Sequence, residues 1–294
     1  MKNKNVTIFG GSGFLGSHLA DSLSENGYNV TTFDNHKSKW KKNNYKEIIG
    51  DISNLDKVST VLKNADYVYH FAAIADIEEA SVNPLKTINV NIIGTTNILE
   101  SCIKNKIKRL CFASSLYVNS NQGGFYSSSK KISEILVKTY SKSYGLNYSI
   151  LRFGSLYGPR SNNTNYIHRT IIEALKKNTI SRKGNGNELR NYIHVKDAAD
   201  ISVKILSNEY KNKIVTISGL ESIKIKDLLN MISEMFNTKI KIKYTSGKMK
   251  GHYKITPYSF EEEIPKRYIG ESRINLEEGL FNTIKNISLN INKK

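Results

Sequence analysis

Two kinds of hydrophobic pattern alternate through the first two thirds of the chain. Short runs rich in β-branched and aromatic residues are typical of buried strands, and the stretches between them carry apolar residues at helical spacing. Strands separated by helices indicate right-handed βαβ units that share a parallel sheet. We therefore expect an α/β fold of the doubly wound, Rossmann type. The expected strands are residues 6–9, 29–33, 67–71, 109–113 and 148–153, and the expected helices are residues 15–26, 56–63, 88–104 and 127–143.

The pattern becomes irregular beyond residue 154, where segments rich in Gly, Asn and Ser interrupt it. Such residues favour turns and loops. We expect this part to form a smaller, loop-rich C-terminal lobe. The predicted division assigns residues 1–154, with a return segment near 188–207, to the first domain, and residues 155–187 and 208–294 to the lobe.

The composition of the 294-residue chain is that of a globular protein. With 39% hydrophobic and 10% aromatic residues, a chain of this length can bury a large core, which excludes global disorder. The 44 Lys and Arg residues outnumber the 26 Asp and Glu residues, so the formal net charge is +18 and favours anionic partners. Acidic residues interrupt the basic ones throughout, and no arginine-rich stripe with interleaved aromatic residues occurs. This distribution argues against a nucleic-acid interface.

Two further features bear on where the protein works. The basic start of the chain is followed by no apolar run of the length of a signal peptide or a membrane span. Cys102 and Cys111 are too few for a disulfide framework and lack the spacing of metal ligands. We therefore expect a soluble cytoplasmic protein with no metal site and no membrane association.

A glycine-rich loop follows the first expected strand. Gly11, Gly13 and Gly16 satisfy the pattern G-x-G-x-x-G, and Gly10, Gly13 and Gly16 satisfy G-x-x-G-x-x-G. Glycine suits this position because the chain turns sharply, its backbone approaches a pyrophosphate, and the following helix presents free N–H groups to the negative charge. A strand precedes the loop and a helix follows it, which is the context that this motif requires. We interpret residues 1–154 as a dinucleotide-binding domain.

Asp34 lies at the end of the second expected strand, about 20 residues after the loop, as expected in this motif. A carboxylate there accepts hydrogen bonds from a ribose 2′-hydroxyl and repels a 2′-phosphate. This favours NAD over NADP. Lys37 and Lys39 follow closely and leave binding of a phosphate open.

Tyr126 and Lys130 are four residues apart and would share one face of the helix expected over residues 127–143. A neighbouring ammonium group favours the phenolate, so the pair can act as a general acid and base near neutral pH. Ser115 lies just beyond the preceding expected strand, at the carboxyl end where doubly wound folds bind their ligands. Its hydroxyl can hydrogen-bond the substrate oxygen that exchanges a proton with Tyr126.

Further motifs extend along most of the chain. They are Asp51-Ile52, Phe71-Ala72-Ala73, Asn91-x-x-Gly94-Thr95, Ser114-Ser115 and the segments 151–160 and 190–199. Together with the glycine loop, Asp34 and Tyr126-x-x-x-Lys130, they resemble the extended short-chain dehydrogenases/reductases, in the branch of the NAD-dependent sugar-nucleotide epimerases and dehydratases. The resemblance is strong to about residue 205 and weak beyond it.

The resemblance implies a role for each matched residue. It implies a catalytic triad of Ser115, Tyr126 and Lys130, a substrate-binding lobe in which Arg190 contacts the nucleotide diphosphate, and a homodimer formed by the helices over 88–104 and 127–143. A surface role for Arg190 stays open, and His194 beside it is expected to be structural. The implied NAD site consists of Gly10, Gly13, Phe14, Leu15, Gly16, Asp34, Asn35, Asp51, Ile52, Phe71, Ala72, Ala73, Asn91, Tyr126 and Lys130.

The chain departs from the family pattern near the expected sugar site. Asn119-Ser120 replaces a common Tyr-Gly pair, and the segment between Ser115 and Tyr126 is shorter than in many relatives. Ser155 occupies a position where epimerases often carry a substrate-binding Asn. Leu116-Tyr117 replaces the acidic pair of the 4,6-dehydratases, which disfavours elimination of water.

We expect a nucleotide-sugar substrate and an epimerase that inverts C4 of a UDP-sugar through a transient keto sugar, for cell-surface polysaccharide synthesis. One alternative is a sugar-nucleotide ketoreductase or dehydrogenase with net redox turnover. Another is a non-catalytic, NAD-binding regulatory module. The nucleotide, the sugar and the role of residues 253–273 stay open, including whether residues 257–260 close over the substrate.

Overall fold

The computed structural model of the chain describes residues 3–42, 44–247, 251–257, 266–268 and 274–291. Contacts between residues divide the chain into two compact units. Unit 1 comprises Met1–Phe153, Ala199–Ile217 and Tyr258–Tyr268, and unit 2 comprises Gly154–Ala198, Ser218–Pro257 and Ile269–Lys294. The predicted division into domains stays a prediction, because contacts do not show which part folds independently.

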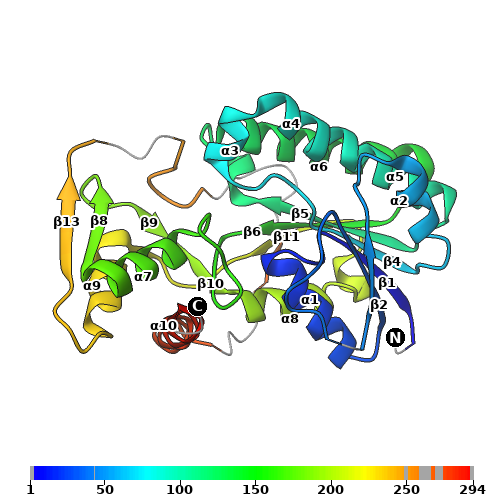
Figure 1. Cartoon of the computed structure of the whole chain (residues 1–294). Helices are drawn as coiled ribbons and strands as arrows, with labels where there is room; N and C mark the ends of the chain where they lie inside the picture. The colour runs from blue at the N-terminus through cyan, green and yellow to red at the C-terminus, as the bar shows by residue number, and fades with distance from the viewer. Residues whose placement is uncertain (1–2, 43, 248–250, 258–265, 269–273, 292–294) are drawn as a thin grey trace. The chain divides into compact units, whose positions relative to one another are not determined.

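Unit 1 is built on a sheet in which every pair of neighbouring strands is parallel. Helices cover both faces of this sheet (Figure 1), so the predicted doubly wound α/β fold is confirmed. The strands, from one edge to the other, are β14 (Lys266–Arg267), β11 (Lys213–Ile217), β6 (Tyr148–Phe153), β5 (Arg109–Ser115), β4 (Tyr67–His70), β1 (Asn5–Phe9), β2 (Asn29–Asp34) and β3 (Lys46–Ile49).

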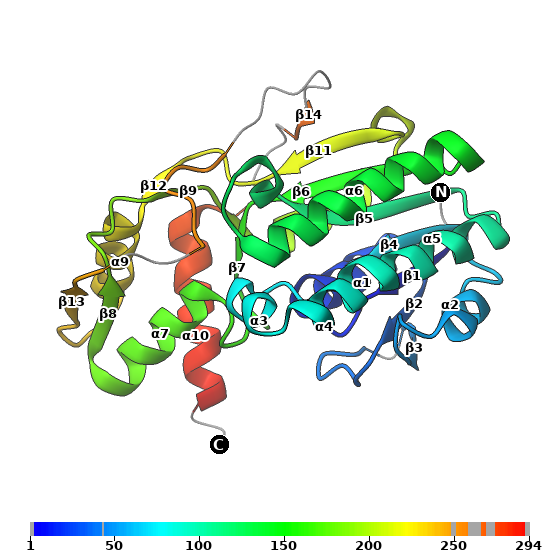
Figure 2. The ribbon, with the colours of Figure 1, turned by 90° about the horizontal axis from the view of Figure 1, so that it is seen from above.

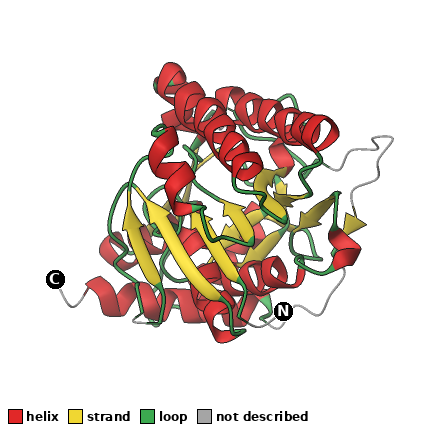
Figure 3. Cartoon of the chain, turned by 90° about the vertical axis from the view of Figure 1, so that its right-hand side faces the viewer, coloured by secondary structure: helices red, strands yellow, loops and turns green. Residues whose placement is uncertain are grey.

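The helices of unit 1 form two layers with the sheet between them (Figure 3). Apolar side chains of the strands and of one helical layer form one core cluster, among them Phe9, Phe33, Phe112, Val58 and Val137. That layer contains α2 (Leu55–Val61), α3 (Ile77–Val82), α4 (Pro84–Ile88), η1 (Asn89–Ile93), α5 (Gly94–Lys104) and α6 (Gly124–Tyr144), whereas α1 (Phe14–Glu25) and α8 (Val195–Lys204) cover the other face and η3 (Asn208–Tyr210) precedes β11.

The strand order reverses between β1 and β4, because β2 lies on the far side of β1 and β5 on the far side of β4. In open α/β sheets, ligands bind outside the carboxyl ends of the strands at such a reversal. The glycine loop follows β1 and the segment beginning with Phe71 follows β4. Both therefore lie at the edge of the sheet where a ligand is expected.

Two helices differ in their bounds from the sequence prediction. The helix expected over residues 88–104 begins four residues earlier at Pro84, which suits the first turn of a helix, and it contains a π-helical turn, η1, before α5. Figure 2 shows α5 and α6 side by side over the sheet. α6 begins at Gly124 and not at residue 127, because Gly123 has a φ of 91° and turns the chain sharply into the helix.

Three helices lie wholly within the described residues of unit 2, whereas the sequence predicted a loop-rich lobe. Ile167, Ile171, Leu228, Ile232 and Leu280 are buried in one apolar core that these helices share. Their amphipathic pattern was hidden by the Gly- and Asn-rich turns between short elements. The elements of unit 2 are α7 (Tyr166–Lys177), α9 (Ile225–Glu234) and α10 (Leu276–Ile291), with the strand pairs β7 (Ser155–Tyr157) and β10 (Tyr192–His194), β9 (Leu189–Arg190) and β12 (Ile223–Lys224), and β8 (Thr179–Lys183) and β13 (Lys241–Thr245).

Candidate functional site

The glycine loop is held tightly between β1, β4 and α1. A Cβ atom on Gly10, whose φ is 84°, would lie 2.5 Å from the backbone nitrogen of Ala72, and a Cβ on Gly16 would overlap the carbonyl oxygen of Gly10. Gly13 precedes α1, and no side chain caps the first N–H groups of the helix there. The loop therefore leaves a helix N-terminus open to an anion, and only glycine fits its two tightest positions.

Asp34 ties the end of β2 to this loop. Its Oδ2 accepts a hydrogen bond of 2.9 Å from the backbone N–H of Ser12, and its Oδ1 accepts one of 2.8 Å from the N–H of Asn35. The Nδ1 atom of His36 lies 3.1 Å from Oδ1. A carboxylate has about four acceptor positions, so Asp34 keeps the capacity to bind a ribose hydroxyl. Lys37 and Lys39 are exposed nearby.

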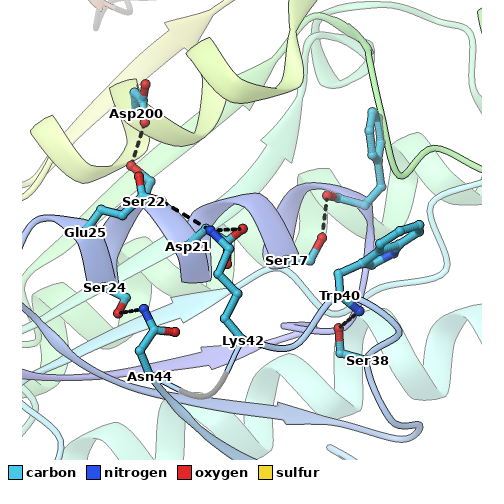
Figure 4. A network of polar contacts seen from close by, with 11 residues as sticks. Ser17, Asp21, Ser22, Ser24, Glu25, Ser38, Trp40, Lys42, Asn44 and Asp200 are labelled. Atoms are coloured by element: carbon cyan, nitrogen blue, oxygen red, sulfur yellow. Dashed lines mark hydrogen bonds and ion pairs between the residues drawn. The ribbon is translucent and has the colours of Figure 1, made fainter. Parts of the chain in front are cut away.

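The loop between Asp34 and β3 is fastened to α1 (Figure 4). The Lys42 ammonium lies 3.1 Å from Asp21 Oδ2 and 3.3 Å from Glu25 Oε1, and the Asn44 amide donates a 2.6 Å hydrogen bond to Ser24 Oγ. These contacts hold the segment that follows the candidate ribose site against the helix that follows the glycine loop. The same helix is tied to α8, because Ser22 Oγ donates a 2.6 Å hydrogen bond to Asp200.

Three more predicted cofactor residues follow β4. Phe71 N–H donates a 2.8 Å hydrogen bond to the carbonyl of Phe9, which continues the pairing of β4 with β1. Because Gly10 contacts the backbone of Ala72, the structure brings the glycine loop together with Phe71, Ala72 and Ala73. These residues lie at the reversal of strand order.

Asp51 and Ile52 follow β3 and differ in exposure. Asp51 is exposed and accepts a 2.8 Å hydrogen bond from the N–H of Ser53, whereas Ile52 is buried. Ile52 packs onto Gly94, where a Cβ would lie 2.5 Å from its Cδ1 atom. The Gly of the motif Asn91-x-x-Gly94 therefore makes room for Ile52.

Asn91 lies in the π-helical turn and is 2% exposed. Its side chain accepts a hydrogen bond from the N–H of Ile74 (2.8 Å) and donates to the carbonyl of Ile74 (3.0 Å) and to Ser129 Oγ (2.9 Å). These bonds join the segment after β4 to α6. Asn91 therefore holds the segment after β4 and the helix α6 together next to the candidate NAD site.

The predicted catalytic residues all lie in unit 1. Ser115 ends β5, and its Oγ accepts a 3.3 Å hydrogen bond from the N–H of Tyr117. Tyr126 lies in the first turn of α6, half-buried, with its ring edge-on to Tyr117 at 6.2 Å between centroids. Lys130 follows one turn later and is 4% exposed. Tyr117 therefore contacts both Ser115, through its N–H, and Tyr126, through its ring.

The Lys130 ammonium is held inside the protein. Its Nζ donates a 2.7 Å hydrogen bond to the carbonyl of Ala113 and lies 4.9 Å from the centre of the Phe112 ring. Burial lowers the pKa of Lys130 to about 8, and the Glu134 carboxylate acts in the opposite direction. A lysine of this kind changes its charge in the range in which a general acid or base works.

Ser155 and Arg190 lie in unit 2. Ser155 is half-buried in β7, beside Tyr192 of β10. Arg190 is 7% exposed; it donates hydrogen bonds of 2.8 Å to the carbonyl of Leu189 and 2.6 Å to that of Tyr253, whose ring lies 4.1 Å from the guanidinium carbon. The alternative of a surface arginine is therefore wrong.

A cavity of about 770 Å³ lies next to Arg190 in unit 2, with Leu189 and Tyr253 among its lining residues. His194 is buried and edge-on to Tyr157, as a structural histidine would be. Residues 258–260, which were considered as a cover for the substrate, lie outside the described residues.

A buried network that was not predicted from the sequence lies behind the predicted catalytic residues. Arg152 in β6 pairs with Glu134 in α6 and also bonds Asn119, the residue that replaces the common Tyr. One signal was present in the sequence, because Arg152 is the only charged residue of a buried strand and needs a buried partner.

Comparison with known proteins decides the family. Residues 6–218 match the NAD dependent epimerase/dehydratase family. The chain belongs to this family. The predicted membership and the predicted NAD cofactor are confirmed by the match. The glycine cradle and the uncapped N-terminus of α1 fit NAD, because a Cβ at Gly10 or Gly16 would fill the space that the backbone needs.

Several epimerase/dehydratase family members are similar over most of their length. The chain is 32% identical over 248 residues, 77% of this chain and 81% of the relative, to a protein of Methanocaldococcus jannaschii with the provisional name UDP-glucose 4-epimerase. It is 30% identical over 90% of its length to a UDP-N-acetyl-alpha-D-glucosaminuronate decarboxylase of Bacillus cytotoxicus, of which 88% is covered. The structure of a UDP-N-acetylglucosamine 4-epimerase from Methanobrevibacter ruminantium, in complex with UDP-N-acetylmuramic acid, superposes with a TM-score of 0.87 at 28% identity and covers 99% of this chain and 100% of that one.

Proposed function

We propose that the protein is an NAD-dependent sugar-nucleotide epimerase that inverts C4 of a UDP-sugar. The observation that carries this proposal is the combination, within unit 1, of the glycine cradle with Ser115, Tyr126 and Lys130 at the carboxyl end of the sheet. Two of the relatives named above carry the name 4-epimerase, and both act on UDP-sugars by that name. Leu116-Tyr117, which contains no carboxylate, supports epimerisation over dehydration.

In this mechanism Tyr126 exchanges the proton and Lys130 adjusts the proton affinity of Tyr126. The Lys130 cation favours the phenolate, so Tyr126 can take the proton from the C4 hydroxyl of the sugar. Ser115 donates a hydrogen bond to the same oxygen and orients it. NAD, which the glycine loop and Asp34 would hold, would supply the acceptor and later the donor of the C4 hydride. Tyr126 gives the proton back to the oxygen of the keto sugar after its opposite face is presented, which yields the inverted alcohol.

Unit 2 supplies the residues that we assign to the substrate. The Arg190 guanidinium suits the two oxygens of a nucleotide diphosphate, since it can donate to both at once. Leu189 and Tyr253 accept from two of its five N–H donors in this structure, so the guanidinium keeps donors that a diphosphate can use. The adjacent cavity of about 770 Å³ has the size of a nucleotide site. Ser155 is assigned to the sugar.

A second candidate is oxidative decarboxylation of a UDP-hexuronic acid. The relative from Bacillus cytotoxicus favours it by its name. This reaction needs the same first step, because a ketone at C4 activates the carboxyl group at C5 for loss of carbon dioxide. Release of carbon dioxide from UDP-glucuronic acid or its N-acetylated analogue would identify it.

The first test is to denature the protein, purified without added cofactor, and to measure the nicotinamide released. About one equivalent of NAD supports a cofactor that is regenerated in each cycle, and turnover of UDP-glucose or UDP-N-acetylglucosamine without added NAD, followed by NMR at C4, then identifies the epimerase. Consumption of added NAD or NADH in proportion to product identifies the net oxidoreductase. A Tyr126→Phe variant as active as the wild type contradicts the proton-transfer role of Tyr126. A wild-type protein that binds NAD but turns over no sugar nucleotide leaves the regulatory module.

We also propose a homodimer formed through α5 and α6. Ile93, at the end of η1 directly before α5, is 49% exposed, and Ile132 and Ile135 on α6 are 42% and 57% exposed. These values are high for isoleucine on helices of one layer. Burial of such side chains against a second copy supports the assembly. Light scattering should give twice the mass of one chain, and Ile135→Glu should give the mass of a monomer.

Two further assignments complete the proposal. No helix of the described ranges is both long and apolar enough to cross a bilayer. The free thiols of Cys102 and Cys111 are compatible with the cytoplasm, in which sugar nucleotides for cell-surface polysaccharides are made, and we propose this setting.

A further inference from the structure

A buried ion pair joins α6 to β6 directly behind the predicted catalytic residues. The Arg152 guanidinium donates two hydrogen bonds to Glu134, from Nε to Oε1 at 2.9 Å and from Nη2 to Oε2 at 2.7 Å. The two side chains are only 3% and 6% exposed. A charged pair at this depth is costly to desolvate, so this one calls for a role that apolar packing could not fill.

The pair also holds the end of β5. Ser114 lies opposite Arg152 in the parallel pairing of β5 with β6, and its Oγ donates a 2.5 Å hydrogen bond to Glu134 Oε1. Ser115 is the next residue. Arg152 uses Nη1 for a 2.9 Å hydrogen bond to Oδ1 of Asn119, at the end of the 3₁₀ turn η2 (Leu116–Asn119). The segment that begins at Ser115 is therefore attached to the ion pair at both of its ends.

The third connection runs along α6. Tyr126, Lys130 and Glu134 are spaced by four residues, so they follow one another on one face of the helix. Glu134 anchors this face to β5 and β6, while Tyr126 and Lys130 extend it towards the carboxyl end of the sheet. One bidentate contact thus fixes the helix that carries two members of the triad and the strand that carries the third.

We propose that Glu134 and Arg152 are positioning residues whose ion pair holds Ser115, Tyr126 and Lys130 in their reactive arrangement. This inference rests on the proposed function, since it concerns the proton transfer assigned to those three residues. Neither member of the pair touches the reacting atoms in this scheme. Asn119, which departs from the family pattern, is the third partner through which the pair supports η2.

The pair also influences the charge of Lys130. Burial lowers the pKa of Lys130, and Glu134 opposes that effect from the next turn of α6. His70 on β4 also interacts electrostatically with this lysine, and Arg152 on β6 binds the same Glu134 carboxylate. His70 is neutral, because burial and the positive charge of Lys130 hold its pKa well below the usual range. Loss of the whole pair removes two opposite charges, so its expected effect on Tyr126 comes from position. Lys130 would be held less firmly beside Tyr126, and the pKa of the Tyr126 phenol should therefore rise.

The test removes both charges together, because Glu134→Gln alone strands a buried guanidinium and can prevent folding. In Glu134→Met with Arg152→Met, we expect the acidic limb of the pH profile of kcat to move to higher pH by about one unit. At a fixed pH below that limb, kcat should then fall approximately tenfold. KM for the UDP-sugar should stay within about twofold, since the substrate contacts assigned to unit 2 are unchanged. The matched control neutralises the Asp66–Lys108 pair, 2.7 Å apart at the amino ends of β4 and β5, by Asp66→Asn with Lys108→Met. The control should keep the wild-type profile.

A second measurement requires no substrate. The tyrosinate absorbance of each protein, minus that of the same protein with Tyr126→Phe, gives the titration of Tyr126 alone, and this titration should move to higher pH in the double variant only. A folded double variant with the wild-type titration and the wild-type kcat profile overturns the proposal. If the double variant does not fold, Asn119→Ala, which cuts only the contact to η2, decides the question: a lower kcat at unchanged KM supports positioning, and a wild-type kcat overturns it. Failure of the proposed function would look different, because the wild-type protein itself would turn over no UDP-sugar.

Discussion

Alanine substitutions at Gly10 and Gly13 of the nucleotide loop should have different effects. Gly10→Ala should lower stability, and Gly13→Ala should lower the affinity for NAD. At Gly10, alanine must adopt a φ of 84°, and its Cβ would lie 2.5 Å from Ala72 N and 2.7 Å from Phe71 C. The left-handed conformation costs about 1–2 kcal/mol. Displacement of the β4 backbone adds about 1–3 kcal/mol, as overpacking does in cores. Gly10→Ala should therefore destabilise the protein by about 2–5 kcal/mol and lower Tm by roughly 4–20 °C.

Gly13 has a φ of −73°, which alanine adopts without strain, and the nearest atom to its added Cβ is the Gly10 carbonyl oxygen at 3.2 Å. The stiffer unfolded chain offsets this tight contact by about 0.4–1 kcal/mol, so Tm should change by only a few degrees. The methyl group would instead stand where the backbone approaches the pyrophosphate. We expect NAD affinity to fall at least tenfold, or about 1.4 kcal/mol.

The assay pairs thermal unfolding of the cofactor-free proteins with calorimetric titration of NAD. Gly10→Ala should show the larger loss of Tm, and Gly13→Ala should show a near-wild-type Tm with weak NAD binding. The reasoning is refuted if Gly13→Ala binds NAD with wild-type affinity, or if it loses as much Tm as Gly10→Ala. The first result would remove the pyrophosphate from this loop, and the second would make both glycines structural.

Three further predictions follow from the site and the core. Asp34→Asn should weaken NAD binding and reduce the preference for NAD over NADP, because the amide no longer repels a 2′-phosphate. The dissociation constants of the variant for NAD and for NADP measure this change. Lys130 has a pKa of about 8 when folded and 10.5 as a free side chain, so the unfolded chain binds more protons between these values and stability should rise with pH there; denaturant unfolding of Lys130→Met should lack this rise. Burial raises the pKa of Cys111 to about 12 and that of Cys102 further, so neither thiol should react with a thiol reagent until the protein unfolds; labelling followed by mass spectrometry shows whether one does.

Local pattern predicted the positions of five strands of the sheet, β1, β2, β4, β5 and β6, but it gave no bounds for β3, β11 or β14. The strand predicted over residues 148–153 has the observed bounds, because all six of its residues are buried and the run is uniformly apolar apart from Arg152 and Ser149. β14 has only two residues and joins the sheet beside β11, far along the chain, so no local periodicity indicates it. The π-helical turn in residues 89–93 also escapes prediction, since its apolar spacing resembles that of an ordinary helix.

Part of the candidate site could likewise be predicted from the sequence, and part could not. Gly10, Asp34, Tyr126 and Lys130 were found because their chemistry depends on spacing along the chain, and spacing is visible in a sequence. The hydrogen bonds of Asn91 to Ile74 and Ser129 connect residues 17 and 38 positions apart, so their geometry follows only from the fold. Arg190 illustrates the remaining difficulty: its burial depends on Tyr253, more than 60 residues away, and no local pattern pairs the two.

Neighbouring strands of the unit 1 sheet are far apart along the chain, and this affects folding during protein synthesis. β6 is complete when residue 153 leaves the ribosome, but its outer neighbour β11 begins only at residue 213. At about 5–20 residues per second, the buried, apolar edge of β6 waits several seconds for its partner. An unpaired edge of this kind is a template for pairing with other chains. We therefore expect chaperones to bind a nascent chain of this length. A chain truncated after residue 153 should aggregate and should not form an isolated nucleotide-binding domain.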